Sequence, residues 1–264
     1  YTNGNNPTKT YWLENSGTGT YIYHQLYEPY SQNGIESGKT DLQLADINGD
    51  GYLDMILSHY DANRVSIFKN LGNGSFSGSQ PIASYTLHPI SIAIADLDND
   101  GLNDIIAGTG DLLFYKNLGN FAFDQEQILL TAVGEITALD VSDIDGDSDL
   151  DVLIGNSSNY SVSWYENTGS LVFGAENSIT TQTNSWINSV HATDIDQDGI
   201  KDVLFSAYHT GITAWSKNSG NGTFSSPQII GDNNFSVYCA TAIDIDNDGD
   251  QDVADLTYIA HGIF

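Results

Sequence analysis

The chain has 264 residues and a strongly acidic composition, with 35 aspartates and glutamates against 7 lysines and arginines and a formal net charge of -28. A surface of that charge repels phosphate backbones and anionic lipid headgroups, so we expect neither a nucleic-acid partner nor binding to a membrane surface. The 40% hydrophobic content is enough for a folded core. The sequence has no apolar run of 18 residues that would predict membrane insertion.

The first 45 residues contain two strand-like segments and no acidic loop. Residues 11–15 lead into a turn with Gly17, and residues 21–23 follow as a short apolar segment. Asparagine and glycine tolerate the positive φ angles that tight hairpins require, so these segments predict a hairpin.

From residue 46 the chain repeats one nine-residue loop five times, with side-chain oxygens at positions 1, 3, 5 and 9 and an apolar run directly after it. The first aspartates of successive copies lie 50, 47, 51 and 50 residues apart, and the repeat units begin near residues 45, 95, 142, 193 and 243. A fixed period of this size is typical of solenoids and propellers. The twenty positions are Asp46, Asn48, Asp50, Asp54, Asp96, Asp98, Asp100, Asp104, Asp143, Asp145, Asp147, Asp151, Asp194, Asp196, Asp198, Asp202, Asp244, Asp246, Asp248 and Asp252.

The spacing of these carboxylates predicts about five Ca²⁺ sites. Alternate acidic residues in a tight turn point oxygens inward, a glycine at position 6 lets the backbone bend, and a carbonyl at position 7 can complete an all-oxygen shell. Mg²⁺ fits less well because it retains several waters. The third loop departs from the pattern, since Ser148 replaces the glycine. A helix–loop–helix calcium site would need glutamate at position 12, where this chain has Leu57, Ala107, Ile154, Phe205 and Asp255.

Each period contains four strand-like segments. In the second copy these are residues 91–95, 104–107, 112–115 and 121–123. An Asn-x-Gly turn joins the last two segments of each repeat and begins at Asn15, Asn70, Asn117, Asn167 and Asn218. Alternating apolar residues without helical periodicity indicate an all-β protein.

Four strands in about 50 residues, repeated, predict the blades of a β-propeller. We expect residues 1–264 to form a single propeller domain of five four-stranded blades, closed by pairing of an N-terminal and a C-terminal half-blade. The fifth blade would be shared between residues 240–264 and 1–40. The alternative is that both half-blades are cut ends of a larger propeller, and seven blades would need about 350 residues at this period.

The acidic loops, together with Ser163-Trp-Tyr-Glu-Asn167-Thr-Gly169 and Tyr11-Trp-Leu-Glu-Asn15, resemble the FG-GAP/VCBS-type repeats of integrin α-subunit propellers and of many secreted bacterial proteins. The resemblance covers nearly the whole chain. It implies a calcium-stabilised propeller, extracellular or on the cell surface, that serves in adhesion, glycan binding or as an accessory domain. The family usually has seven blades, whereas this chain has five loops.

Residues that break the repeat are the candidates for ligand recognition. Trp186 has no counterpart in the other repeats, and an aromatic side chain in its Ser/Thr/Asn-rich segment could stack on a sugar ring. Tyr60, Tyr208 and Tyr258 each follow the last loop aspartate by six residues, and His59 and His209 adjoin two of them. In contrast, Trp12, Phe114, Trp164 and Trp215 lie three residues before the turn asparagine, and we expect them to pack between blades.

The sequence favours a non-enzymatic binding or adhesion module, because it has no nucleophile elbow, no zinc-protease motif and no paired histidines. The expected partner is a glycan or an extracellular protein, and the chain would act as a monomer or as a domain of a larger polypeptide. A scaffold or accessory domain without its own small ligand is the alternative, and a polysaccharide-active enzyme has the least support. Cys239 is the only cysteine, so bound ions would replace the disulfides of other secreted proteins.

Overall fold

The computed structural model describes residues 11–17, 19–26, 41–84, 88–181, 183–232 and 236–258. Those ranges contain twenty β-strands and no helix, and so no helix that could span a membrane. The strands form four antiparallel sheets of four strands and two sheets of two strands. The expected all-β class and the four-stranded unit are thereby confirmed.

Each complete sheet follows one repeat in chain order, with every strand paired to the next. The first sheet has β3 (Leu42–Ala45), β4 (Asp54–His59), β5 (Arg64–Phe68) and β6 (Gln80–Ser84). The second has β7 (Ser91–Ala95), β8 (Asp104–Gly108), β9 (Leu112–Tyr115) and β10 (Gln127–Leu130). The third has β11 (Ile136–Ser142), β12 (Asp151–Asn156), β13 (Ser161–Asn167) and β14 (Phe173–Thr180). The fourth has β15 (Ile187–Thr193), β16 (Asp202–Ala207), β17 (Ile212–Ser216) and β18 (Gln228–Asp232).

The prediction that residues 121–123 form the fourth strand of the second repeat was wrong. Residues 121–123 lie in the turn, where Asn117 and Phe123 form an isolated bridge, and β10 begins only at Gln127. The reason is local, since Asn120 and Phe121 have positive φ angles of 53° and 61° that an extended strand does not allow.

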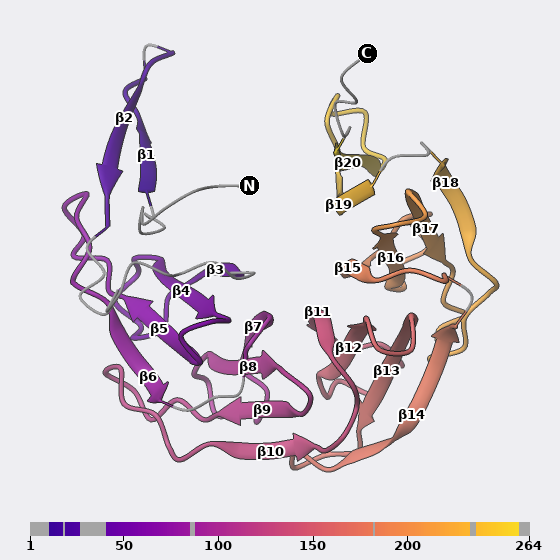
Figure 1. The fold of residues 1–264 in the computed structure, drawn as a ribbon, viewed down its shortest axis with the longest axis horizontal. Helices are drawn as coiled ribbons and strands as arrows, with labels where there is room; N and C mark the ends of the chain where they lie inside the picture. Colours follow the sequence, from indigo (N-terminus) through magenta and orange to yellow (C-terminus); the bar gives the residue numbers. More distant parts are fainter. Residues whose placement is uncertain are drawn as a thin grey trace.

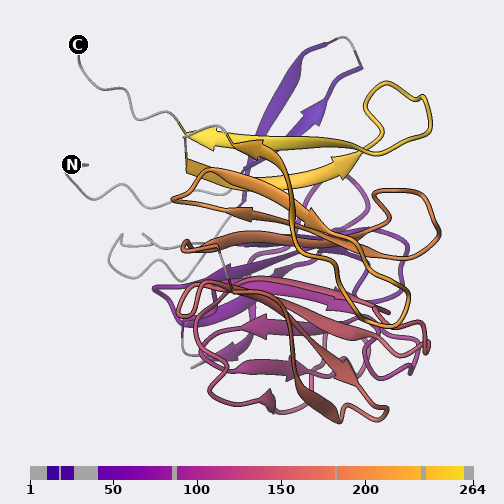
Figure 2. The same ribbon diagram turned by 90° about the vertical axis from the view of Figure 1, so that its right-hand side faces the viewer.

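The sheets are arranged around a common axis (Figure 1), with β3, β7, β11, β15 and β19 nearest the centre. Strands β6, β10, β14 and β18 lie on the outside. Each acidic loop joins the first two strands of its sheet, so all five loops share one end of the axis. Figure 2 shows the loop between β19 and β20 at that end, on the right.

Neighbouring sheets fit together through matched side-chain sizes. At each contact, one sheet contributes the residue three positions before its turn asparagine. The next sheet contributes the residue four positions after its own turn asparagine. Trp164 covers Gly222 so closely that a Cβ added there would lie 2.1 Å from the indole, and Trp12 lies 4.0 Å from the corresponding position at Gly74. Where the first residue is smaller than tryptophan, the second is larger than glycine. Ile67 shares a core cluster with Phe121, and Phe114 shares one with Leu171. The expectation that Trp12, Phe114 and Trp164 pack between blades is confirmed.

The two ends of the described chain form half-blades. Strands β1 (Tyr11–Asn15) and β2 (Tyr21–Gln25) make one hairpin, and β19 (Ser236–Ile243) and β20 (Asp252–Tyr258) make the other. The described strands β1 and β20 are not paired, so the arc stays open between them (Figure 1). The five-bladed ring therefore stays a prediction.

Each half-blade nevertheless packs on the complete sheet that would be its neighbour in a closed ring. Leu26, directly after β2, is buried in one cluster with Met55 and Phe68 of the first sheet. At the other end, Ala240 donates its backbone N–H to Ser189 Oγ at 2.9 Å and Val237 donates to the Tyr208 carbonyl at 3.2 Å, which ties β19 to the fourth sheet.

Candidate metal centres and axial cavity

The five acidic loops share one backbone fold. In each loop the first aspartate accepts a hydrogen bond from the N–H of residue 6, as Asp46 Oδ2 does from Gly51 at 2.8 Å and Asp96 Oδ2 from Gly101 at 2.8 Å. The third loop keeps this fold despite its serine, because Ser148 adopts a φ of 79° and donates to Asp143 Oδ2 at 3.2 Å. A non-glycine residue in that region is strained, so the loop fold is maintained at a conformational cost.

The last aspartate of each loop ties the loop to the rest of its sheet. Asp104 is fully buried, and its two oxygens accept the backbone N–H groups of Leu97 at 3.2 Å and Asn117 at 2.8 Å. The equivalent pair of bonds recurs at Asp54, Asp151 and Asp202. These aspartates thus hold the acidic loop against the Asn-x-Gly turn.

Two of the turn asparagines, Asn117 and Asn218, extend this connection to the preceding sheet, a function that the sequence analysis missed. Asn117 Nδ2 donates to the Ile47 carbonyl at 2.8 Å, and Asn218 Nδ2 donates to the Ile144 carbonyl at 2.7 Å. Both asparagines are fully buried. The only sequence signal for this contact was that asparagine recurs at a turn position that other residues could also occupy.

The loops bring carboxylates together as a cation site requires. In the second, third and fourth loops, oxygens of positions 1, 3 and 9 lie within 4.8 Å of one another, and in the fifth loop those of positions 1, 3 and 5 do. The second loop also contains Asp98 Oδ1, a buried oxygen without a hydrogen-bond partner, which a bound cation would satisfy. This donor set consists of oxygen only and fits a hard cation such as Ca²⁺. In the first loop the Asn48 amide donates to Asp50 at 2.9 Å.

Burial and charge crowding raise the pKa of two of these carboxylates, Asp104 and Asp151. Burial raises the pKa of Asp104 to about 6, and the charges of Asp98 and Asp100 add to the effect. Burial likewise raises the pKa of Asp151 to about 6, with repulsion from Asp145 and Asp147. A divalent ion would favour the ionised forms.

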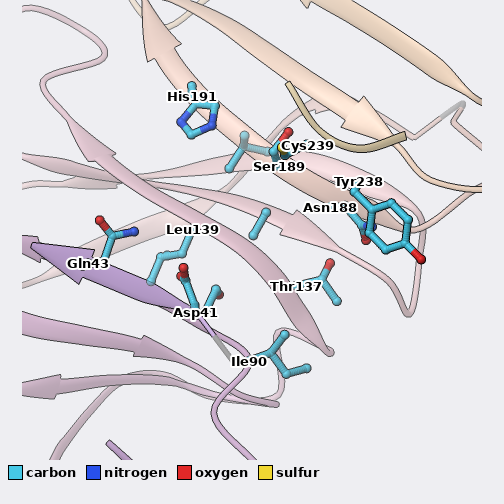
Figure 3. Close-up of a pocket in the computed structure, with 13 residues that line it drawn as sticks. Asp41, Gln43, Ile90, Thr137, Leu139, Asn188, Ser189, His191, Tyr238 and Cys239 are labelled. Atoms are coloured by element: carbon cyan, nitrogen blue, oxygen red, sulfur yellow. The ribbon is translucent and has the colours of Figure 1, made fainter. Parts of the chain in front are cut away.

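A cavity of about 390 Å³ is lined by residues in or next to β3, β7, β11, β15 and β19, the strands nearest the centre of the arc, and Figure 3 shows its lining. Its polar lining includes Asp41, Thr137, Asn188, His191 and Tyr238. Asn188 Oδ1 is buried and has no hydrogen-bond partner, whereas Asp41 Oδ2 accepts the N–H of Ile92 at 2.9 Å. The cavity therefore offers hydrogen-bonding groups to a polar ligand.

Four aromatic side chains at the end opposite the acidic loops form what we call the aromatic rim: Trp186, Tyr208, His209 and Tyr238. Trp186 stacks on Tyr208 at a ring separation of 6.2 Å and lies 4.7 Å from the ring of His209. Tyr208 meets Tyr238 edge-on at 5.0 Å, and Tyr238 also lines the cavity. The structure thus brings together three residues predicted separately and adds Tyr238, which the sequence analysis missed.

The other predicted recognition residues lie elsewhere. Tyr60 stacks on His88 at 4.5 Å, beside the first sheet. His59 is buried, and its Nε2 lies 2.6 Å from Ser66 Oγ inside that sheet. Tyr258 ends β20, and its side chain lies outside the described part of the chain.

The FG-GAP-like repeat matches residues 46–107, 143–205 and 194–254, which together make up more than half of the sequence. The chain belongs to the FG-GAP-like repeat family. Each matched segment begins at one acidic loop, continues through the last three strands of that sheet and the first strand of the next, and ends in the strand after the second loop. No curated protein matches this FG-GAP-like chain.

Solved structures share the fold at low sequence identity. An Agrocybe aegerita lectin, whose structure explains specific recognition of non-reducing terminal N-acetylglucosamine, matches with a TM-score of 0.62 and 20% identity over 84% of this chain. This FG-GAP-like chain covers 60% of the lectin's length. The V. cholerae biofilm matrix protein Bap1 matches with a TM-score of 0.46 and 19% identity, over 87% of this chain and 36% of Bap1.

We predict that the metal-free protein becomes less stable as pH rises from about 4 to about 6. The pKa values of Asp104 and Asp151 are about 6 in the folded state against 3.8 for an unperturbed carboxyl group, so the unfolded chain loses these protons first as pH rises and becomes favoured. Urea unfolding of metal-free protein across this range measures the effect. An Asp104→Asn/Asp151→Asn variant should show a flatter profile, and a stability that rises with pH in the wild type would contradict the assignment.

Proposed function

We propose that this chain is a calcium-stabilised, non-enzymatic binding module of an extracellular protein, and that it recognises a glycan through the aromatic rim and the axial cavity. The observation that carries the proposal is the position of Tyr238, which belongs to both. Stacked aromatic side chains at the mouth of a cavity with polar walls are suited to a ligand with one apolar and several polar faces.

The chemistry of the site fits a sugar. The exposed face of Trp186 can pack against the C–H face of a pyranose, while Asn188 and Asp41 can hydrogen-bond hydroxyl groups inside the cavity. The Agrocybe aegerita lectin supports the proposal through its shared fold. At 20% identity its sugar specificity is not carried over to this chain.

Calcium would stabilise the module from the opposite end of the axis. The oxygen donor sets of the loops suit Ca²⁺, and millimolar extracellular calcium fills even modest sites. Because the ions would bind the folded chain and not the unfolded one, they would add stability by mass action. The ions would therefore hold the blades, and the aromatic rim would bind the ligand.

We predict that Trp186→Ala abolishes glycan binding or weakens it about fivefold or more, since an aromatic contact contributes on the order of 1 kcal/mol or more. A glycan array, followed by calorimetry on the best sugar, measures this. Tyr23→Ser on β2 is the matched control, because Tyr23 is the most exposed aromatic of the N-terminal hairpin and lies away from the aromatic rim. Absence of any glycan bound by the wild type would favour the alternative, a scaffold domain without its own small ligand.

We also propose that the ring closes with five blades through pairing of β1 with β20. The pairing of large and small residues between neighbouring sheets supports this. Trp215 of the fourth sheet occupies the same repeat position as Trp164, and Gly19 of the N-terminal hairpin occupies the same position as Gly222. Trp215 is half-buried, and Gly19 has no neighbour within 4 Å. A closed ring would place the indole of Trp215 over Gly19, as Trp164 covers Gly222.

The four complete sheets also define the register of the missing pair. In each sheet the residue two after the last loop aspartate pairs with the residue three before the turn asparagine. The observed pairs are Ile56 with Ile67, Ile106 with Phe114, Leu153 with Trp164, and Leu204 with Trp215. Transferred to the half-blades, this rule pairs Ala254 with Trp12 and Val253 with Leu13.

A disulfide tests the closed ring. We predict that Leu13→Cys/Val253→Cys, in a Cys239→Ser background, cross-links within one chain on mild oxidation. Leu13→Cys/Ala254→Cys is the control, because a shift of one residue places the two side chains on opposite faces of the sheet. Cross-linked dimers, or no cross-link, would contradict closure within the chain.

A pair of glycine substitutions tests the same closure without a cross-link. Gly19 and Gly119 have φ angles of 81° and 82°, and neither has a neighbour within 4 Å. An open arc predicts equal costs for Gly19→Ala and Gly119→Ala. The closed ring predicts a larger loss of stability for Gly19→Ala, because only there would the added methyl group meet Trp215.

A further inference from the structure

One position differs systematically among the five repeats. The residue directly before the turn asparagine is Lys69, Lys116 or Lys217 in the first, second and fourth repeats, whereas it is Glu166 in the third. The N-terminal hairpin carries Glu14 there. The chain has only 7 lysines and arginines, so three of its few cations are found at this one position.

The lysines contact the carboxylates proposed to hold the cation. Lys116 Nζ donates to Asp98 and, at 2.7 Å, to Asp100, which are positions 3 and 5 of the second loop. Lys217 Nζ makes the same two contacts in the fourth loop, with Asp196 and, at 2.6 Å, Asp198. Lys69 lies 3.5 Å from Asp50 in the first loop, where position 3 is an asparagine. An ammonium group is thus the built-in counter-ion of these three loops.

The third loop has the opposite arrangement. A carboxylate oxygen of Glu166 lies within 4.8 Å of oxygens of Asp145 and Asp147, which are positions 3 and 5. The third loop therefore has an additional oxygen ligand and no internal cation.

We propose that the residue before the turn asparagine sets the cation affinity of each loop, with Glu166 acting as an additional ligand of a tight third site and Lys69, Lys116 and Lys217 competing with the ion in weaker sites. The inference rests on the proposed function, in which the loops hold Ca²⁺. Pairing of β1 with β20 would bring Glu14 beside the fifth loop and place that loop in the tight class.

The two classes would respond differently to a fall in calcium. A loop with a lysine keeps one positive charge among its carboxylates after the ion leaves. The third loop has none, so its carboxylates repel one another as soon as its ion is lost. Exchanging a positive for a negative group a few ångströms from a divalent ion should change affinity by about tenfold or more, even in a solvated site.

Calorimetric titration of the metal-free protein with CaCl₂ at low ionic strength tests the proposal. We expect tight and weak classes in the wild type, one tight site fewer in Glu166→Lys, and one more in Lys116→Glu. Glu166→Gln and Lys116→Gln should give smaller shifts in the same directions, and they avoid a reversed charge that could unfold a loop. Glu176→Lys is the control, because it makes the same charge change at an exposed position on β14.

The outcomes separate the two proposals. Unchanged numbers of tight sites in both charge-reversal variants, with calcium still bound by the wild type, would overturn this inference and leave the proposed function standing. A wild-type chain that takes up no calcium would contradict the proposed function itself. A loss in Glu176→Lys as large as in Glu166→Lys would show that net charge, and not this position, sets the affinity.

Discussion

The structure depends on holding several carboxylates close together at one end of every blade. Two of the carboxylate positions cannot move apart without breaking the fold. The first aspartate of each loop accepts backbone N–H groups of its own turn, and the last is fixed by two backbone bonds in the four complete sheets. Because the oxygens are fixed, their charge must be neutralised by protons, by lysine or by a bound cation. Burial, together with repulsion from the neighbouring carboxylates, raises the pKa values of Asp104 and Asp151.

The same contacts extend from the loops to the packing of the blades. The last loop aspartate positions the turn asparagine, and in the second and fourth sheets the asparagine side chain bonds to the preceding sheet, as Asn117 does to Ile47. The turn then presents Gly222 or Phe121 to the side chain of the neighbouring sheet. A disturbed acidic loop should therefore weaken the contact between two sheets and not only its own turn. The aromatic rim lies at the other end of the strands, so it can vary without affecting these contacts.

Much of this architecture could be predicted from sequence because it repeats. The period of the acidic loops predicted the four-stranded unit, and Trp12, Phe114 and Trp164 were correctly expected to pack between blades. The fourth strand of the second repeat was misplaced because the alternation at Phe121 and Phe123 resembles a strand, while positive φ angles make it a turn. The aromatic rim could be predicted only in part, since Trp186 and Tyr208 belong to different segments and Tyr238 carries no signal of its own. The lysine contacts depend on distances between strands that spacing does not reveal.

The claim that cations neutralise the loops and thereby hold the blades together is tested most directly by thermal unfolding. Circular dichroism should follow the wild-type chain at neutral pH in millimolar CaCl₂ and after exhaustive removal of metal. Several occupied sites, each contributing on the order of 1–3 kcal/mol, predict a melting temperature lower by about 10 °C or more in the metal-free protein. Equal melting temperatures in the two conditions would contradict the account.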